Sequence, residues 1–539
     1  MIIKSGIPAS KGYAIGRVLL QLATSIRITD EVVSDIESEK EKFITAVSQS
    51  KEQLEKLISD TKQNLGESEA DIFEAHIMLL EDPELTSSIF SRMEETGENA
   101  LKAVSIVTEE YIAVFDAMED EYLRERAADI KDVSGRIIAN LAGTQHELRI
   151  DEENTIVVAH DLTPSDTAGL DRSKVAAFLT DVGGRTSHTA IMARIMGIPA
   201  VVGMGDITAA VKDGDRIIVD GINGEVILCP SDSQLEEYQV KMMTYHEELN
   251  YLKKLASIET MTKAGKRIHV AGNIGKPEDV EQVLQNGGDG IGLFRTEFLY
   301  MDRQEAPSEQ EQYEGYRYVL NKMPGERVVI RTLDIGGDKQ LSYLKLPTEM
   351  NPFLGYRAIR LCLDRKEIFK VQLRALLRAS VHGQLAVMFP MISSLEEFIQ
   401  AMAVVQECKD ELTEEGLSYS ENIEWGIMVE IPSAALSADQ LAASVDFFSI
   451  GTNDLVQYTL AVDRMNEKVS YLYDPMHTAV LKLIKMTIDA AHQHGKWVGM
   501  CGEMAGEETA IPTLVEYGLD EFSMNASSIL PAKKLIISL

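Results

Sequence analysis

Cysteine, basic residues and long apolar runs are all scarce in this sequence, and each scarcity excludes a class of protein. The chain has four cysteines in 539 residues, and none of them forms a Cys-x-x-Cys pair. This argues against a disulfide framework or a structural zinc site and favours a reducing cytosol. No run of 18 apolar residues occurs, and the N-terminal residues MIIKSGIPASKGYAIG lack the apolar core of a signal peptide. We therefore expect a cytoplasmic protein with no membrane partner.

The shortage of positive charge restricts the partners further. There are 52 Lys and Arg residues against 86 Asp and Glu, and the formal net charge is −34. Such a balance disfavours nucleic acid and anionic membranes, and it favours a basic protein or acidic small molecules held by a few local arginines. The hydrophobic content of 45% is that of a globular protein. A chain this long is too large for one core, so two to four domains are expected.

The first half of the chain contains two kinds of sequence pattern. Residues 1–22 and 146–229 carry short apolar runs with glycine punctuation, such as TIVVAHDL and PAVVGMG, which predict strands of a compact α/β domain. Residues 23–145 are charge-rich and nearly free of glycine. Within them Phe73, His76 and Leu80 fall on one helical stripe. We therefore predict that a helical subdomain interrupts the α/β domain, and that residues 230–263 form a polar linker helix.

The second half, residues 264–539, predicts a (β/α)₈ barrel. Eight apolar strand candidates are separated by helical or mixed segments, and this repeated βα order is typical of that fold. The candidates are RIHVAGN, DGIGLFR, RVVIRTL, LAVMFPM, WGIMVEI, DFFSIGT, WVGMCGE and DEFSMN. The predicted fold class is thus a multidomain α/β protein that ends in a barrel.

Polar side chains stand where these strands end, which is the face on which barrels of this kind carry their sites. They are Asn273, Arg295, Arg331, Glu430, Asn453, Asp454, Cys501 and Glu503. Two arginines can clamp a phosphate or carboxylate through charge-assisted bonds, and two carboxylates can hold Mg²⁺. The thiol is a candidate proton donor or acceptor. Each residue also has a plain structural interpretation, as an ion pair, a core cysteine or a helix cap, but their combination on one face favours a site.

The segment VGGRTSHTAIMARIMGIP (182–199) places His188 among small hydroxyl residues where a helix begins. A glycine turn that enters a helix exposes backbone N–H groups and the positive end of the helix dipole, which suit a phosphate. A neutral imidazole there can act as a nucleophile towards phosphorus. A lone histidine is more often a satisfied polar residue, yet these surroundings favour a phosphorylated one.

Seven ordered motifs resemble enzyme I of the bacterial sugar phosphotransferase system, the phosphoenolpyruvate–protein phosphotransferases. They are GGRTSHTAIMAR, GLFRTEFLYMDR, IRTLDIGGDK, NPFLGYRAIR, GIMVEIPSA, FFSIGTNDLVQYTLAVDR and GKWVGMCGEMAG. The resemblance covers nearly the whole chain. It implies a swivelling phosphohistidine domain (1–22 and 146–229), an inserted helical domain that binds the carrier HPr (23–145), and a barrel that binds phosphoenolpyruvate (PEP) and dimerises (264–539).

The resemblance also implies a role for each matching residue. His188 would be phosphorylated, Thr167 would be its hydrogen-bonding neighbour, and Cys501 would protonate the enolate of pyruvate. Glu430 and Asp454 would bind Mg²⁺. The residues expected at PEP are Arg295, Arg331, Asn453 and Arg464, with Lys339 near its phosphate. Residues 63–91 hold seven acids and no Lys or Arg, which suits a basic carrier, although such a patch is otherwise a solvated face. The residues expected to contact HPr are Glu67, Asp71, Glu74, His76, Met78, Leu79 and Glu84.

Two other functions are compatible with parts of this pattern. A pyruvate, phosphate dikinase or PEP synthase shares a mobile phosphohistidine domain and a related barrel, but it also needs an ATP-grasp domain for which the sequence offers no candidate segment. A regulatory homologue without turnover would not need to retain every expected site residue. The resemblance also implies a further C-terminal helix in the family, so we expect a shortened barrel domain after LPAKKLIISL.

Overall fold

The computed structural model describes residues 2–21, 33–64, 67–116, 121–144, 150, 152–168, 170–171, 173–185, 187–301, 303–337, 341, 343–344, 346–466 and 468–539. It divides into two compact units, Met1–Glu248 and Leu249–Leu539. Among the residues in these ranges, no helix combines the length and apolar character that crossing a bilayer would need.

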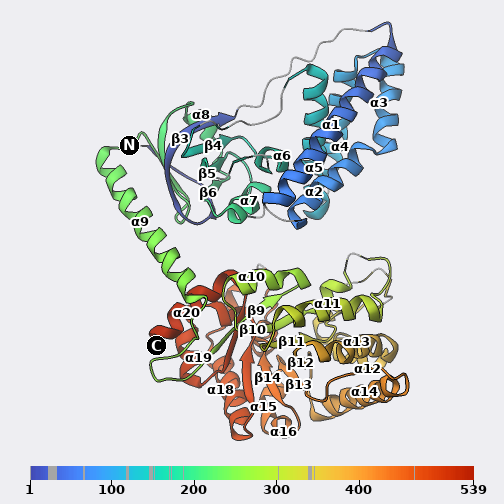
Figure 1. Ribbon diagram of the computed structural model, residues 1–539, viewed down its shortest axis with the longest axis vertical. Coiled ribbons are helices and arrows are strands. Elements are labelled where there is room, and N and C mark those ends of the chain that lie inside the picture. Colours follow the sequence, from blue (N-terminus) through green and yellow to red (C-terminus); the bar gives the residue numbers. More distant parts are fainter. Residues whose placement is uncertain are drawn as a thin grey trace. The chain divides into compact units, whose positions relative to one another are not determined.

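The first unit contains a single eight-stranded sheet built from two separated stretches of chain (Figure 1). Its strands lie in the order β1-β8-β7-β3-β4-β5-β6-β2. Strands β3 to β6 are parallel, and the pairs at the two sides are antiparallel. The predicted α/β class is confirmed. The strands are β1 (Ile2–Ser5), β2 (Ile7–Ser10), β3 (Tyr13–Gln21), β4 (Thr155–Ala159), β5 (Val175–Thr180), β6 (Ala200–Val202), β7 (Arg216–Asp220) and β8 (Glu225–Leu228).

Three short helices follow the strands of this sheet, and five longer ones intervene between β3 and β4. The short ones are α6 (Pro164–Ala168), α7 (His188–Met196) and α8 (Ile207–Ala210). The intervening ones are α1 (Ile36–Asn64), α2 (Glu67–Leu80), α3 (Pro83–Thr96), α4 (Ala100–Asp116) and α5 (Glu121–Ala142). Figure 1 shows these five packed together as a bundle. The core of the bundle includes Phe43, Phe73 and Ile89. The apolar stripe predicted at Phe73 and Leu80 lies in that core because one face of the helix must be buried.

The second unit is a closed barrel of eight parallel strands. All eight predicted strands are confirmed: β9 (His269–Ile274), β10 (Gly290–Arg295), β11 (Arg327–Arg331), β12 (Gln384–Phe389), β13 (Glu424–Val429), β14 (Phe447–Ile450), β15 (Trp497–Met500) and β16 (Glu521–Met524). The α-helices of this unit are α10 (Val280–Gln285), α11 (Glu309–Lys322), α12 (Ile359–Asp364), α13 (Lys366–Ala379), α14 (Leu395–Glu414), α15 (Pro432–Leu436), α16 (Ala438–Ala442), α17 (Thr452–Leu460), α18 (Thr478–Gln493), α19 (Ile511–Tyr517) and α20 (Ala526–Ser538).

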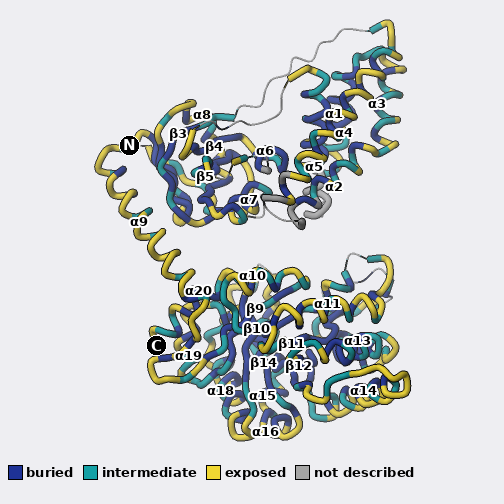
Figure 2. Tube along the Cα trace, in the orientation of Figure 1, coloured by how far each residue is buried: buried dark blue, intermediate teal, exposed yellow. Residues whose placement is uncertain are grey.

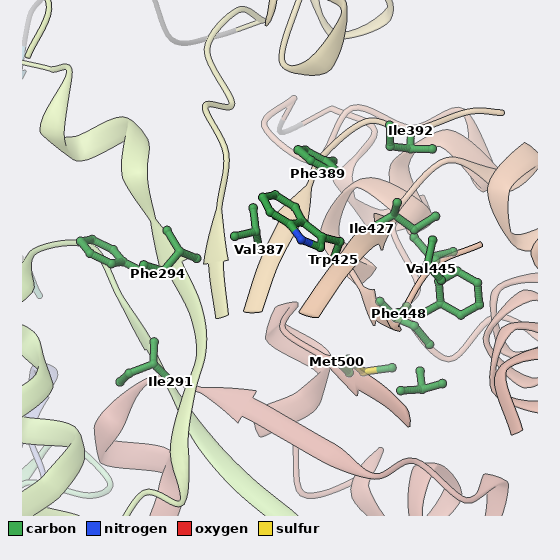
Figure 3. Packing of buried hydrophobic residues seen from close by; sticks show 14 of the residues in the cluster. Ile291, Phe294, Val387, Phe389, Ile392, Trp425, Ile427, Val445, Phe448 and Met500 are labelled. Atoms are coloured by element: carbon green, nitrogen blue, oxygen red, sulfur yellow. The ribbon is translucent and has the colours of Figure 1, made fainter. Parts of the chain in front are cut away.

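Side chains alternate between the inside and the outside of the barrel, and this alternation separates core from site. The outward cluster packs strands against helices. Figure 3 shows Phe389 and Trp425 stacked in it, with ring centroids 5.8 Å apart. The inward cluster includes Met388, Met428 and Cys501. Figure 2 shows the strands as the most buried part of the unit and the outer faces of helices such as α14 as exposed.

The predicted linker helix differs in length from the observed one. Helix α9 (Asp232–Leu255) ends before residue 263, because Met261 pairs with Arg267 in an antiparallel bridge. The carbonyl of Ile258 accepts a hydrogen bond from Lys533 of α20 at 3.4 Å. The segment after α9 is therefore attached to the barrel unit by backbone contacts that helical periodicity does not predict.

Candidate active site

A cavity of about 220 Å³ opens where the barrel strands end. Its lining includes all of the strand-end residues that were predicted to bind substrate or metal. These residues follow five different strands of the barrel. Those lining residues are Arg295, Arg331, Glu430, Asn453, Asp454, Arg464, Cys501 and Glu503. The predicted strand-end residue Asn273 has a different position. Its Nδ2 donates to the carbonyl of Cys501 at 3.0 Å and so braces the adjacent strand exit.

Arg331 is held between two buried carboxylates. Its Nη2 lies 2.5 Å from Glu297 Oε1, and its Nη1 lies 2.9 Å from Asp334 Oδ2. Burial by itself lowers the pKa of the guanidinium, but the two carboxylates outweigh it and the pKa is raised. The guanidinium is therefore fixed in place and permanently charged, as an anion-binding group requires.

Arg357 joins the same network, although the sequence analysis did not assign it. Its Nη2 lies 3.0 and 3.1 Å from the two oxygens of Asp334 and 3.1 Å from Asp454 Oδ2. Its Nη1 donates to Tyr458 Oη at 3.1 Å. The backbone is close-packed here, because a Cβ on Gly336 would lie 2.5 Å from Arg357 Cβ.

Reading only the strand exits missed Arg357, Asp334 and Glu297. Arg357 lies before α12, in a loop that returns to the cavity from outside the strand pattern. The signal was nevertheless present in the motifs IRTLDIGGDK and NPFLGYRAIR, each of which contributes one partner of the Asp334–Arg357 pair.

Three carboxylates crowd one side of the cavity. Burial, together with the neighbouring negative charges of Asp454 and Asp334, raises the pKa of Glu430 to about 8 against the opposing effect of the nearby arginines. Glu430 Oε1 accepts the backbone N–H of Met391 at 2.6 Å. Within the described ranges, no group of three or more His, Cys, Asp or Glu side chains has metal-site geometry. The oxygen-only donors Glu430 and Asp454 nevertheless fit Mg²⁺, which takes few protein oxygens and relieves such repulsion.

The thiol of Cys501 is buried at the inner end of the cavity. Ser449 Oγ donates to its Sγ at 3.3 Å, and burial raises the pKa of the thiol to about 11. It therefore stays protonated at neutral pH. Near the mouth, Asn453 Nδ2 donates to Glu503 Oε1 at 3.3 Å, and Arg464 Nη1 lies 3.6 Å from the same oxygen. Asn453 and Arg464 are thus linked through one exposed carboxylate.

His188 opens helix α7 in the other unit. Ser187 caps the helix by accepting the N–H of Ala190 at 3.4 Å, and Gly183 supplies the positive φ of 106° that the preceding turn needs. Burial lowers the pKa of His188 to about 4. The imidazole is therefore neutral at pH 7 and has a free ring nitrogen with which to attack an electrophile.

Two further residues are predicted near the phosphate, Thr167 and Lys339. Thr167 lies on α6, which packs against α7, and its Oγ1 lies within hydrogen-bonding distance of two local carbonyls, 3.0 Å from that of Pro164 and 3.3 Å from that of Thr163. Lys339 lies outside the described residues.

The acidic surface of the helical bundle is partly neutralised from α1. Lys62 pairs with Glu74 at 3.0 Å, which the count of basic residues within 63–91 could not reveal. Met78 is 72% exposed, Glu84 is exposed, and Leu79 is partly buried against the bundle core. The side chains of Glu67 and Asp71 lie outside the described residues.

His76 requires a correction. It is predicted at the carrier surface, but the structure buries it to 1% exposure. Its ring packs edge-on against Phe73, and its Nε2 lies 3.2 Å from Asp129 Oδ1 on α5. The helical stripe that carries Phe73 faces the bundle and takes His76 with it.

Three family models match the chain. Residues 250–539 match the PEP-binding domain of PEP-utilising enzymes, residues 151–224 their mobile domain, and residues 5–126 their N-terminal domain. The first match spans more than half of the chain.

Curated relatives agree over nearly the full length. The phosphoenolpyruvate-protein phosphotransferase of Staphylococcus carnosus (strain TM300) is 52% identical over 535 residues, which cover 99% of this chain and 93% of the relative. That of Bacillus subtilis (strain 168) is 52% identical over 536 residues, which cover 99% and 94%. The agreement confirms the resemblance inferred from the seven motifs. The chain therefore belongs to the phosphoenolpyruvate-protein phosphotransferase family, enzyme I of the sugar phosphotransferase system.

Proposed function

We propose that this protein takes the phosphoryl group of PEP onto His188 and passes it to the small carrier protein HPr, releasing pyruvate in the cytoplasm. The observation that carries the proposal is a division of chemistry between the two units. One unit holds a neutral imidazole at a helix start, and the other holds a cavity with arginines, carboxylates and a protonated thiol. Each half supplies what the other lacks for phosphoryl transfer.

The cavity suits a small dianionic or trianionic ester. Arg295, Arg331, Asn453 and Arg464 are the proposed PEP ligands, and Arg357 adds a guanidinium already held between Asp334 and Asp454. A cavity of about 220 Å³ accommodates a phosphate and a carboxylate on a three-carbon unit. Lys339 remains a proposed phosphate contact.

Glu430 and Asp454 are the proposed Mg²⁺ ligands. A bound Mg²⁺ would offset charge on phosphoryl and carboxylate oxygens of the substrate. Apart from that contribution, the guanidinium groups of Arg331 and Arg357 orient the substrate, because neighbouring carboxylates hold each of them in one position.

The reaction balances with the residues present. A lone pair on the neutral imidazole of His188 forms the P–N bond, and the P–O bond of PEP breaks with its electron pair leaving on the enolate oxygen. The enolate then takes a proton at its methylene carbon from Cys501, whose raised pKa keeps it protonated until that moment. Because His188 and the cavity belong to different units, we propose that they meet during turnover and part afterwards.

The carrier is proposed to dock on the helical bundle. The supporting features are the exposed Met78 and the acids of residues 63–91, which suit a basic partner. Thr167 is proposed to support the phosphohistidine from α6, and the barrel unit is proposed to form a homodimer.

Replacing His188 with alanine tests the proposal. Purified H188A, incubated with Mg²⁺ and ³²P-labelled PEP, should acquire no acid-labile label and should pass none to HPr, whereas the wild-type chain should do both. Replacing His160, an exposed histidine of the same unit that pairs with Asp181, provides the matched control and should leave labelling intact. Covalent labelling of H188A at the wild-type rate would overturn the proposal.

A further inference from the structure

A buried polar cluster lies where the helical bundle meets the α/β part of the first unit. It consists of His76 on α2, Asp132 on α5 and Ser165 on α6. His76 and Asp132 are each 1% exposed, and Ser165 is 8% exposed. Asp132 Oδ2 accepts the backbone N–H of Ser165 at 3.1 Å and lies 3.8 Å from His76 Nδ1.

Each member of this cluster has an unused polar atom. Asp132 Oδ1, His76 Nδ1 and Ser165 Oγ are buried and have no hydrogen-bond partner among the residues that the structure describes. Burying such atoms without partners is costly, and each one calls for an explanation, of which a role at a functional site is one. A core built only for stability would fill these positions with apolar side chains.

The nearby group is His188. Asp132 and Asp129 raise the pKa of its imidazole and His76 lowers it, against the larger lowering effect of burial. Among the described residues, these are the three side chains whose charge acts on the ring, and all three come from the helical bundle. Asp132 also holds Ser165 at the start of the α6 turn that carries Thr167 and packs against α7.

The chemistry of the phosphorylated ring explains why a carboxylate is useful there. A neutral imidazole keeps one N–H, so forming a P–N bond at its other nitrogen leaves the ring formally cationic until that proton is lost. Burial disfavours such a cation, as the low pKa of His188 shows. A buried carboxylate next to the ring offsets this penalty when charge develops on the ring.

We propose that Asp132, with His76 as its counter-group, is a positioning residue that supports His188 during phosphoryl transfer. This inference rests on the proposed function of His188. Asp132 holds the α6 turn beside α7, and its carboxylate compensates the positive charge that the ring acquires. His76 lies between the two carboxylates, 3.2 Å from Asp129 and 3.8 Å from Asp132.

The test uses the full chain with Asp132→Asn, which keeps the side-chain shape and an acceptor oxygen but removes the charge. Rapid-quench measurement with ³²P-labelled PEP should show the rate constant for His188 phosphorylation falling about 10-fold or more, while KM for PEP changes less than about twofold, because PEP binds in the other unit. Glu109→Gln, which removes a charge from an exposed acid on α4, is the matched control and should change neither value.

A second readout separates charge from architecture. In ¹⁵N-histidine-labelled protein, Asp132→Asn should lower the pKa of His188, whereas His76→Gln should raise it. A purely structural role would not shift the pKa in opposite directions. Wild-type phosphorylation rates in Asp132→Asn, or His188 titrations unchanged in both variants, would overturn this inference while leaving the proposed function intact. Labelling of H188A would overturn both.

Discussion

The barrel cavity holds Arg331 and Arg357 between carboxylates, whereas His188 lies on a half-buried helix start where burial lowers its pKa to about 4. The first site is an interlocked ion network whose members fix one another. The second is a single ring on which side chains of the helical bundle act, with Asp132 and Asp129 raising its pKa and His76 lowering it. A histidine that receives a phosphoryl group at one site and passes it to a carrier protein must be accessible to both. A cavity that binds a small trianion must instead be rigid.

The comparison predicts that the barrel network fails as a unit. Arg357→Ala removes the guanidinium that bridges Asp334 and Asp454 and leaves Asp334 paired with Arg331 alone. Removing one partner of a buried pair costs about 3–5 kcal/mol. We expect kcat/KM for PEP to fall at least about 100-fold and the thermal transition of the barrel to move to lower temperature. Arg365→Ala, which breaks an exposed pair with Glu367, is the control and should change little. Near-normal turnover in Arg357→Ala would show that the network is not interlocked.

A second polar network surrounds Glu521. It lies where the barrel strands begin, whereas the cavity lies where they end. Arg327 Nη1 lies 3.4 Å from Glu521 Oε2, and its guanidinium stacks 3.7 Å from the Trp497 ring. Burial raises the pKa of Glu521 to about 7 from its ordinary value of 4.5, despite the opposing effect of Arg327. The protonated form is therefore favoured in the folded state.

The sign of the resulting pH dependence follows from linkage. The stability that Glu521 contributes is fully present below about pH 4.5 and is lost as the pH rises through about 7. Glu521→Gln should remove this dependence, so the wild-type barrel should lose up to about 3 kcal/mol relative to the variant over that interval. Denaturant unfolding at a series of pH values measures the difference, with the exposed Glu421→Gln as control. Parallel curves for wild type and Glu521→Gln would contradict the prediction.

A substitution at Cys501 should separate pyruvate formation in the barrel unit from phosphoryl transfer by His188. We expect its effect on the rate to be smaller than that of Arg357→Ala. Its thiol pKa of about 11 predicts that pyruvate formation stays independent of thiol ionisation from pH 6 to 9. Cys501→Ala should slow pyruvate release about 10- to 100-fold, as loss of a proton donor does. Transfer from phosphorylated His188 to HPr should be unchanged. Cys408→Ala, at another buried thiol, is the control, and an equal loss in both variants would assign Cys501 a packing role.

The βα repeat in the sequence predicted the functional residues that lie at the ends of the barrel strands. Arg331, Glu430 and Cys501 end or follow strands, so locating the strands located the residues. Arg357 and Asp334 belong to a long connection between β11 and α12, where no repeat relates sequence position to place in space. The linker helix was predicted too long because its expected end at residue 263 falls in a non-helical segment, where Met261 pairs with Arg267.

The amino-acid sequence by itself determined the class of each unit, the eight barrel strands and the family, because local patterning and ordered motifs are properties of neighbouring residues. Only the tertiary structure decided that His76 is buried, that Arg357 reaches the cavity, and that Asp132 of the helical bundle accepts a hydrogen bond from Ser165 of the α/β part. Each of these depends on which distant segments share a low-dielectric interior, where partners and pKa values are set by contacts between residues far apart in the chain.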